Sequence, residues 1–155
     1  MIANRLVLDT NVCLDLFVFR DPRWAMLHAA LEAGTLEART RADCRAEWLL
    51  VLRYARFALN AEQIACCTAE FDALIGCLPI ADGAGEPASS IVLPRCSDID
   101  DQKFLETTRD SSAAILITKD KALLKLANRC RRAGLFEILK PENWVAQRMR
   151  AVAAS

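Results

Sequence analysis

The chain has 155 residues, of which 54% are hydrophobic and 26% are charged, and its 20 Lys and Arg residues balance its 20 Asp and Glu residues. This length and balance predict one folded domain over residues 1–155 and exclude a disordered tail. The zero net charge excludes a polycationic nucleic-acid binder, whose affinity depends on uninterrupted neutralisation of phosphates. It does not exclude a nucleic-acid substrate, because a sum of charges does not say where the charges lie.

The cysteines and the histidine predict neither a disulfide framework nor a zinc site. The seven cysteines are an odd number and include no Cys-x-x-Cys pair. The one histidine, His28, has the apolar neighbours Leu27 and Leu31 and is expected on a helix surface without a function. The segment before Asp9 is too short for a secretory signal, and no apolar run approaches the ~18 residues that a membrane helix needs. We therefore expect a soluble protein of the reducing cytoplasm.

The first half of the chain alternates short apolar runs with helical patterns. Leu6, Val7 and Leu8 form an apolar run that Asp9 ends, which predicts a strand buried on both faces. The segments after it are predicted as a helix over 12–19, a helix over 22–34 capped by Asp21, a strand over 36–40, a helix over 41–58, a helix over 61–76 capped by Asn60, and a strand over 77–81.

The second half continues the alternation after a loop. Residues 82–97 contain Gly83, Gly85, Pro87 and Pro94 and predict a loop with a short strand at 91–93. The following segments are predicted as a helix opened by residues 97–101, a strand over 114–117, a helix over 119–132, a strand over 136–139 and a terminal helix begun by Pro141. Strands that alternate with helices predict an α/β fold with a central, mostly parallel sheet between two layers of helices.

Two acids follow predicted strands directly. Asp9 follows the first strand, and Asp120 follows the strand at 114–117 after Thr118 and Lys119. The carboxyl ends of parallel strands lie at one edge of a sheet, where such folds bind their ligands. Each acid could also act only as a helix N-cap.

Two further acids lie on helical stripes that carry apolar residues. Glu47 has Leu50 and Tyr54 three and seven residues ahead, and Asp101 has Phe104 three residues ahead. A carboxylate on an inward stripe is costly unless it is paired or binds a cation. Four such carboxylates would repel one another if the fold gathered them, and Mg²⁺ or Mn²⁺, which prefer oxygen ligands, would relieve that repulsion. This chemistry fits the hydrolysis of a phosphodiester by metal-activated water.

The same residues resemble the motifs of PIN domains, a family of metal-dependent nucleases that includes VapC-like toxins. The resemblance begins with Leu-Asp-Thr-Asn-Val at 8–12 and continues at Glu47. It is strongest in Asp-Ile-Asp-Asp-Gln-Lys-Phe-Leu at 98–105 and Leu-Ile-Thr-Lys-Asp at 116–120, and it extends to Ile-Leu-Lys-Pro-Glu-Asn-Trp at 138–144.

The resemblance implies a single PIN-like domain with a specific set of site residues. It makes Asp9, Glu47 and Asp101 the core catalytic acids and ligands of Mg²⁺ or Mn²⁺, with Asp120 as a more variable fourth. It further implies that Asn11 orients Asp9 through a side-chain hydrogen bond and that Thr118 lines the site. The implied activity is endoribonuclease cleavage of single-stranded RNA, and the implied partners of a toxin are an antitoxin protein and a second copy of the chain.

Two departures from the family and two alternative functions remain open. Lys119 stands where the subgroup often has Gly, and the additional acid Asp15 could join the site or face solvent. A haloacid-dehalogenase-like phosphatase would need an acid at position 11, where this chain has Asn11. A non-catalytic PIN-like module that binds RNA or a protein is the second alternative, although such modules normally lack one or more of the acids.

Basic residues near the predicted acids could hold RNA phosphates. Residues 39–56 carry a surplus of three positive charges and residues 119–132 a surplus of five, counted as Lys and Arg minus Asp and Glu. Arg45, Lys119 and Lys121 are therefore predicted to bind substrate. The sequence contains no run that resembles an aromatic base-stacking array.

Overall fold

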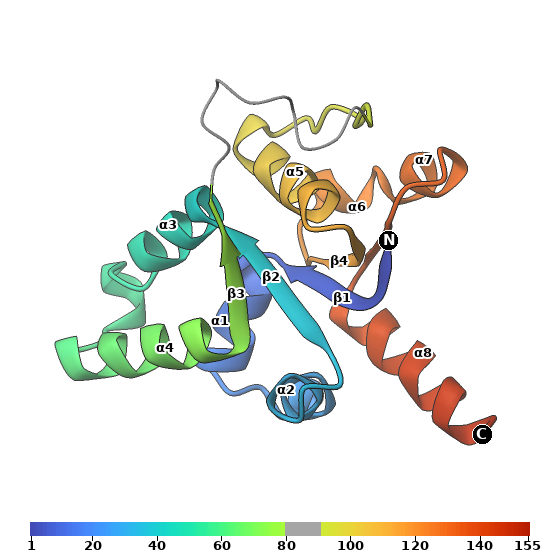
Figure 1. The fold of residues 1–155 in the computed structure, drawn as a ribbon. Helices are drawn as coiled ribbons and strands as arrows, with labels where there is room; N and C mark the ends of the chain where they lie inside the picture. The colour runs from blue at the N-terminus through green and yellow to red at the C-terminus, as the bar shows by residue number, and fades with distance from the viewer. Residues whose placement is uncertain (80–90) are drawn as a thin grey trace.

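Five parallel strands form the centre of the molecule in the computed structural model, which describes residues 1–79 and 91–155 (Figure 1). Their order in the sheet is β3-β2-β1-β4-β5, and every neighbouring pair is parallel. The strands are β1 (Ile2–Leu8), β2 (Glu37–Arg41), β3 (Ile75–Leu78), β4 (Ala113–Ile117) and β5 (Glu137–Leu139). Helices cover both faces, so the predicted three-layer α/β architecture is confirmed.

β1 is the central strand, and its apolar run supplies both faces of the sheet. Leu6 pairs with Ala38 of β2 on one side and with Ile115 of β4 on the other. Because successive side chains of a strand point to opposite faces, Leu6 and Leu8 enter one hydrophobic core while Val7 enters the other. The first core holds Phe17, Trp48 and Phe71 among others, and the second holds side chains such as Phe104 and Leu123.

The helices of the first half form largely where the sequence predicts them. They are α1 (Thr10–Phe17), the 3₁₀ turn η1 (Pro22–Trp24), α2 (Ala25–Glu32), α3 (Ala42–Val51), the 3₁₀ turn η2 (Ala55–Phe57) and α4 (Ala61–Leu74). Asn60 and Gln63 close a capping box at the start of α4, as the predicted N-cap requires.

Two boundaries in this half differ from the prediction. The predicted helix over 41–58 ends at Val51, because the chain turns there and Phe57 packs on Phe19 and Tyr54 instead of continuing a helical face. The predicted helix to residue 76 ends at Leu74, because Ile75 and Gly76 pair with β2 as the first residues of β3. The predicted strand over 77–81 therefore begins two residues earlier, and its residues 80 and 81 lie outside the described residues.

In the second half, η3 (Ile99–Asp101) and α5 (Gln102–Asp110) precede β4, and α6 (Lys121–Leu124), α7 (Ala127–Arg132) and α8 (Pro141–Ala153) follow it. The predicted helix over 119–132 is two short helices, with a turn at residues 125 and 126. Residues 91–93 form no strand, and residues 82–90 of the predicted loop lie outside the described residues. None of the helices in the described ranges is long and apolar enough to cross a membrane.

Candidate active site

Asp9 lies at the carboxyl end of β1, where hydrogen bonds fix its carboxylate. It caps α1 by accepting a hydrogen bond from the Thr10 backbone N–H at 2.7 Å through Oδ1. Its Oδ2 accepts a second hydrogen bond, at 2.6 Å, from the Thr118 hydroxyl, which lies just beyond the end of β4. The Thr118 Oγ1 in turn accepts from the Asp120 backbone N–H at 2.9 Å, so one buried hydroxyl joins two of the predicted acids. Asp120 also caps α6.

Asp101 reaches the same place from η3, on the other side of the cluster. Its side chain is buried, and its Oδ2 has no hydrogen-bond partner in the described parts of the chain. Burial, a hydrogen bond to Asp120 and the charges of Asp120 and Asp9 together raise the pKa of Asp101 to about 7, with burial the largest cause. Asp101 and Asp120 therefore share one electrostatic environment.

The pKa of Asp9 responds to the remaining acids. The pKa of Asp9 is raised to about 6. Burial raises this pKa most and the charges of Glu47 and Asp120 also raise it, whereas the hydrogen bonds from Thr118 and Thr10 lower it. Asp9 thus interacts electrostatically with the three other predicted acids, and Asp101 also interacts with Asp120, although the four come from separate segments of the chain. A carboxylate cluster of this kind is the arrangement that a hard cation stabilises.

Glu47 completes the cluster at its rim, from α3. Its Oε2 accepts a hydrogen bond from the Thr10 hydroxyl, and its Oε1 accepts one from the Lys103 ammonium at 3.0 Å. On the stripe that Glu47 shares, Leu50 and Tyr54 are 60% and 42% exposed whereas Val51, four residues after Glu47, is buried, so the stripe faces the core only in part. Glu47 is nevertheless half-buried, and its charge is balanced within the protein by Lys103.

Lys103 is the site residue that the sequence analysis missed. It projects from the first turn of α5, and its ammonium also donates to the Asp100 carbonyl at 2.5 Å. Its position two residues after Asp101 in the 98–105 motif is the signal that could have found it. In residues 1–79 and 91–155, no three His, Cys, Asp or Glu side chains converge closely enough to hold a metal ion.

The chemistry of the donors nevertheless fits a divalent cation. All four acids offer carboxylate oxygens, the ligand type that Mg²⁺ and Mn²⁺ prefer. The buried, unpartnered Oδ2 of Asp101 is an oxygen that no group of the described protein satisfies, and the raised pKa values of Asp9 and Asp101 reflect burial of their charge and mutual repulsion. A bound cation would remove both costs.

Two of the predicted substrate-binding residues are engaged elsewhere. Arg45 forms two hydrogen bonds with Asp72 of α4, at 2.9 and 2.8 Å, away from the acids. Lys119 forms an ion pair at 2.7 Å with Asp15, whose Oδ2 also accepts from the Trp24 indole N–H at 3.2 Å. Asp15 is therefore neither exposed nor one of the gathered acids; it is the buried partner of Lys119.

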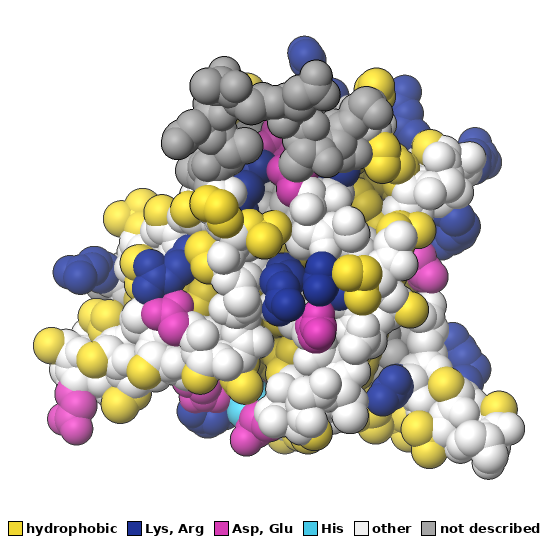
Figure 2. Space-filling view, in the orientation of Figure 1, with side chains coloured by type: hydrophobic (Ala, Val, Ile, Leu, Met, Phe, Trp, Pro, Cys, Tyr) yellow, Lys and Arg dark blue, Asp and Glu magenta, His cyan; other side chains and the backbone are white. Residues whose placement is uncertain are grey.

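The third predicted substrate-binding residue, Lys121, and the predicted supporting residue Asn11 lie near the acids. Lys121, the first residue of α6, is exposed, and its ammonium has no hydrogen-bond or ion-pair partner within the described ranges. The Asn11 amide oxygen accepts from the Lys119 backbone N–H at 3.4 Å, while the hydrogen bonds that orient Asp9 come from Thr10 and Thr118. Asn11 thus contacts the loop after β4 instead of the Asp9 carboxylate. On the face shown in Figure 2, Lys and Arg side chains are spread over the surface and form no single basic field.

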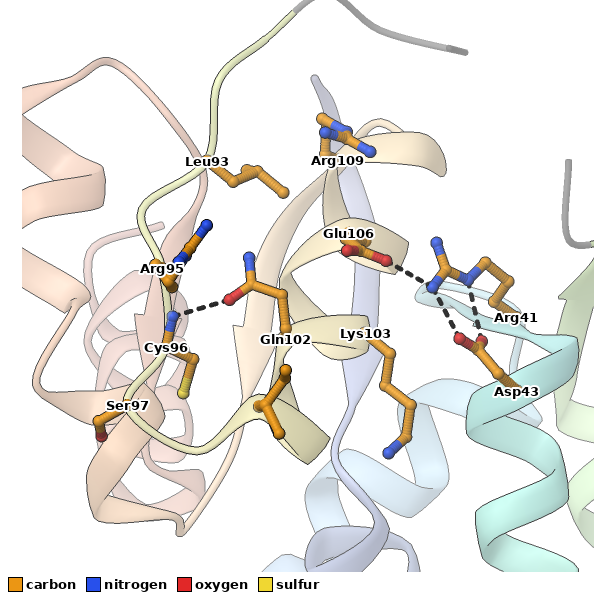
Figure 3. A pocket seen from close by; sticks show the side chains of 11 residues that line it. Arg41, Asp43, Leu93, Arg95, Cys96, Ser97, Gln102, Lys103, Glu106 and Arg109 are labelled. Carbon is orange, nitrogen blue, oxygen red and sulfur yellow. Dashed lines mark hydrogen bonds and ion pairs between the residues drawn. The ribbon is translucent and has the colours of Figure 1, made fainter. Parts of the chain in front are cut away.

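A cleft of about 800 Å³ opens next to Lys103 (Figure 3). On one wall Arg41 donates to Asp43 and Glu106, each at 2.7 Å. On the other, the Gln102 amide holds the loop before η3 by hydrogen bonds to the Cys96 N–H at 2.7 Å and the Pro94 carbonyl at 3.2 Å. Described cations that line the cleft are Arg41, Arg95, Lys103 and Arg109, and the described acids are Asp43 and Glu106, so the lining carries a surplus of two positive charges.

Comparison with known proteins agrees with the motifs. No curated protein matches the chain. A family model described as a PIN domain matches residues 5–122, a span that begins within β1 and ends in α6 and contains all four acids and Lys103. The matched span, the parallel sheet and the gathering of the acids at its carboxyl edge lead to one assignment: the chain belongs to the PIN-domain family, which has a nuclease-type fold.

Proposed function

We propose that this protein is an endoribonuclease that depends on Mg²⁺ or Mn²⁺ and hydrolyses phosphodiester bonds of single-stranded RNA. The observation that carries the proposal is the buried, unpartnered Asp101 Oδ2 beside Asp9 and Asp120, with which Asp101 interacts electrostatically, in a chain of the PIN-domain family. When bound, the cation supplies positive charge for the phosphate and lowers the pKa of the attacking water. The water oxygen then bonds to phosphorus, and the P–O bond to the leaving sugar oxygen breaks.

The residues of the chain have distinct roles in this proposal. Asp9, Asp101 and Asp120 would hold the cation, and Thr118 fixes the Asp9 carboxylate from the side opposite to Thr10. Glu47 would join them when it exchanges the Lys103 ammonium for the cation. The positive surplus of the neighbouring cleft supports RNA as the substrate, because cations beside the acids can hold the phosphates that flank the cleaved bond.

Cleavage of single-stranded RNA with added Mn²⁺ tests the assignment. We expect the wild-type protein to cleave, and Asp9→Asn and Asp101→Asn to lose at least about a hundredfold, because each removes a charged ligand oxygen. Asp72→Asn is the matched control, since it removes a carboxylate that pairs with Arg45 outside the cluster. Equal cleavage by all four proteins would refute the roles of Asp9 and Asp101.

A non-catalytic binding module is the second candidate, and the Lys103–Glu47 ion pair favours it. That pair already neutralises one predicted ligand, as it would in a domain that binds RNA or protein without a metal. Isothermal titration with Mn²⁺ separates the two candidates. A wild-type protein that binds RNA but neither binds Mn²⁺ nor cleaves would be the binding module.

The cellular role that we propose is that of a toxin held inactive by an antitoxin protein, in a cytoplasmic toxin–antitoxin pair, with a second copy of the chain as a further partner. The support is the resemblance of the motifs at 8–12, 98–105 and 116–120 to those of VapC-like toxins. Growth arrest on expression of the wild type, relieved by Asp101→Asn, tests the toxin role. Expression without any effect on growth would contradict it, and the oligomeric state in solution tests for the second copy.

A further inference from the structure

Three aromatic side chains gather on the surface beyond the ends of α1 and α3. Phe19 is 55% exposed and Tyr54 42% exposed, while Phe57 is half-buried between them. The Phe57 ring meets Phe19 edge-on, with centroids 5.7 Å apart, and lies parallel to Tyr54 at 6.4 Å. The Arg56 guanidinium lies over both Tyr54 and Phe57, at 5.4 and 4.9 Å from their centroids. We call these four residues the aromatic surface.

The backbone holds two of these rings outside the core. Phe19 is followed by Arg20 with φ of 48°, and Phe57 by Ala58 with φ of 50°. Residues other than glycine adopt this left-handed conformation rarely and with strain, which is found most often at functional positions. Phe17, two residues before Phe19, is by contrast 2% exposed and fills the core. Core packing therefore does not account for the exposed rings.

The charge around the rings is positive. Arg53 and Arg56 are exposed, and the sequence contains no Asp or Glu between Glu47 and Glu62. Within the described residues, neither arginine forms an ion pair, unlike Arg45 with Asp72. Two uncompensated cations beside flat rings attract a phosphate-bearing ligand with π faces.

The helices α1 and α3 connect the acid cluster to the aromatic surface. The hydrogen bond from Thr10 to Glu47 joins the first residue of α1 to the middle of α3, and both helices run away from the carboxyl edge of the sheet. Phe19 follows the end of α1, which is about 12 Å long at 1.5 Å per residue, and Tyr54 follows the end of α3. Exposed Leu50 shares the Glu47 stripe and lies between Glu47 and Tyr54.

We propose that the aromatic surface stacks bases of the single-stranded RNA whose phosphate lies at the acid cluster, a few nucleotides away. This inference rests on the proposed function. RNA fits this surface because every base has a π face that stacks on aromatic rings or on a guanidinium plane, and because Arg53 and Arg56 complement its charge. The acids alone do not distinguish an unpaired strand from a duplex. Stacking on the aromatic surface requires an unpaired strand, because the bases of a duplex are already stacked on one another.

The test compares intact and abasic RNA. Binding of a labelled oligoadenylate, and of an abasic strand with the same number of phosphates, is measured in the presence of Mg²⁺ on the Asp9→Asn protein, which prevents cleavage. Tyr54→Leu/Phe57→Leu should weaken binding of oligoadenylate about five- to tenfold and leave binding of the abasic strand within twofold. Arg56→Lys keeps the positive charge but removes the planar guanidinium, and it should also weaken the binding of oligoadenylate. Met149→Ala, which truncates an exposed apolar residue of α8, is the matched control and should change neither.

Each other outcome has a definite meaning. Equal weakening of both strands, or no weakening of either, in variants with an unchanged melting temperature would overturn base stacking. If the substitutions in the aromatic surface instead change the oligomeric state, measured by analytical ultracentrifugation, the surface is a protein interface and the proposal is wrong. If the wild type cleaves RNA and Tyr54→Leu/Phe57→Leu changes neither cleavage nor binding, the stacking role is refuted and the proposed nuclease activity stands. A wild type that neither binds nor cleaves RNA would remove the proposed function itself.

Discussion

Replacing Asp101 with Asn should stabilise the protein in the absence of metal while it removes activity. The pKa of Asp101 is about 7, against 3.8 for an unperturbed Asp, so the folded state holds this proton more tightly than the unfolded chain does. Unfolding between these pH values releases a proton, and the free energy of unfolding falls as the pH rises through that range. Above pH 7 the buried charge destabilises the fold, and an uncharged Asn does not.

The magnitude follows from the pKa difference. A shift from 3.8 to about 7 corresponds to about 4 kcal/mol at 1.36 kcal/mol per pKa unit. Asp101 lies in the sequence between Ile99 and Gln102, which line the cleft, and solvent there screens part of its charge, so we expect about half of this, ~2 kcal/mol. For a chain of this length, that difference raises the melting temperature by about 4–8 °C.

Urea unfolding with EDTA at pH 5 and pH 8 measures the effect. The Asp101→Asn protein should exceed the wild type in stability at pH 8 and match it more closely at pH 5. Asp72→Asn should be less stable than the wild type by a similar amount at pH 5 and pH 8, because Arg45 lowers the pKa of Asp72 below 3.8 by hydrogen bonding and charge, so the ion pair is present at both pH values. An Asp101→Asn protein that is less stable than the wild type at pH 8 would refute the reasoning. Added Mn²⁺ should stabilise the wild type and have little effect on this variant.

Three further results are expected. Lys103→Met should raise the affinity for Mn²⁺ about fivefold in isothermal titration, because the Lys103–Glu47 ion pair, which contributes ~1 kcal/mol, no longer competes with the cation for Glu47. Weaker binding would show that Lys103 supports the metal site instead. Thr118→Val should lower the Mn²⁺ affinity about tenfold by releasing Asp9, whereas Thr118→Ser should restore it. Trp48→Ala should lower the free energy of unfolding in urea by about 3–4 kcal/mol, because it removes a buried side chain. Trp48→Phe should lower it much less, because the buried Trp48 indole N–H has no partner in the described parts. Equal losses in the two variants would contradict this account.

The sheet and two of its acids could be predicted because their signals are local. Leu6, Val7 and Leu8 are adjacent in the sequence, and Asp9 follows them, so the strand and the edge position of the acid come from one short segment. The same holds for Asp120 after β4. Glu47 and Asp101 were indicated by their helical stripes and by the family resemblance, but their placement depends on how helices pack.

The errors arose where the structure depends on contacts between distant residues. The partner of Glu47 is Lys103, 56 residues away, and that of Arg45 is Asp72, 27 residues away, so counting charges within one segment could find neither partner. The aromatic surface joins Phe19 to residues 54–57. A search for a contiguous aromatic run cannot find a cluster that two separate turns assemble.

The contacts of Arg41 bear on how this protein tolerates mutation. Its guanidinium binds Asp43 at 2.7 Å, Glu106 at 2.7 Å and Asp110 at 3.3 Å, and so links the start of α3 to α5. Substitution of any one of the three acids leaves two that still hold the guanidinium. Loss of Arg41 leaves three carboxylates facing one another between the helices that carry Glu47 and Lys103. Each acid can therefore be substituted in turn during evolution with less effect on the fold than substitution of the arginine.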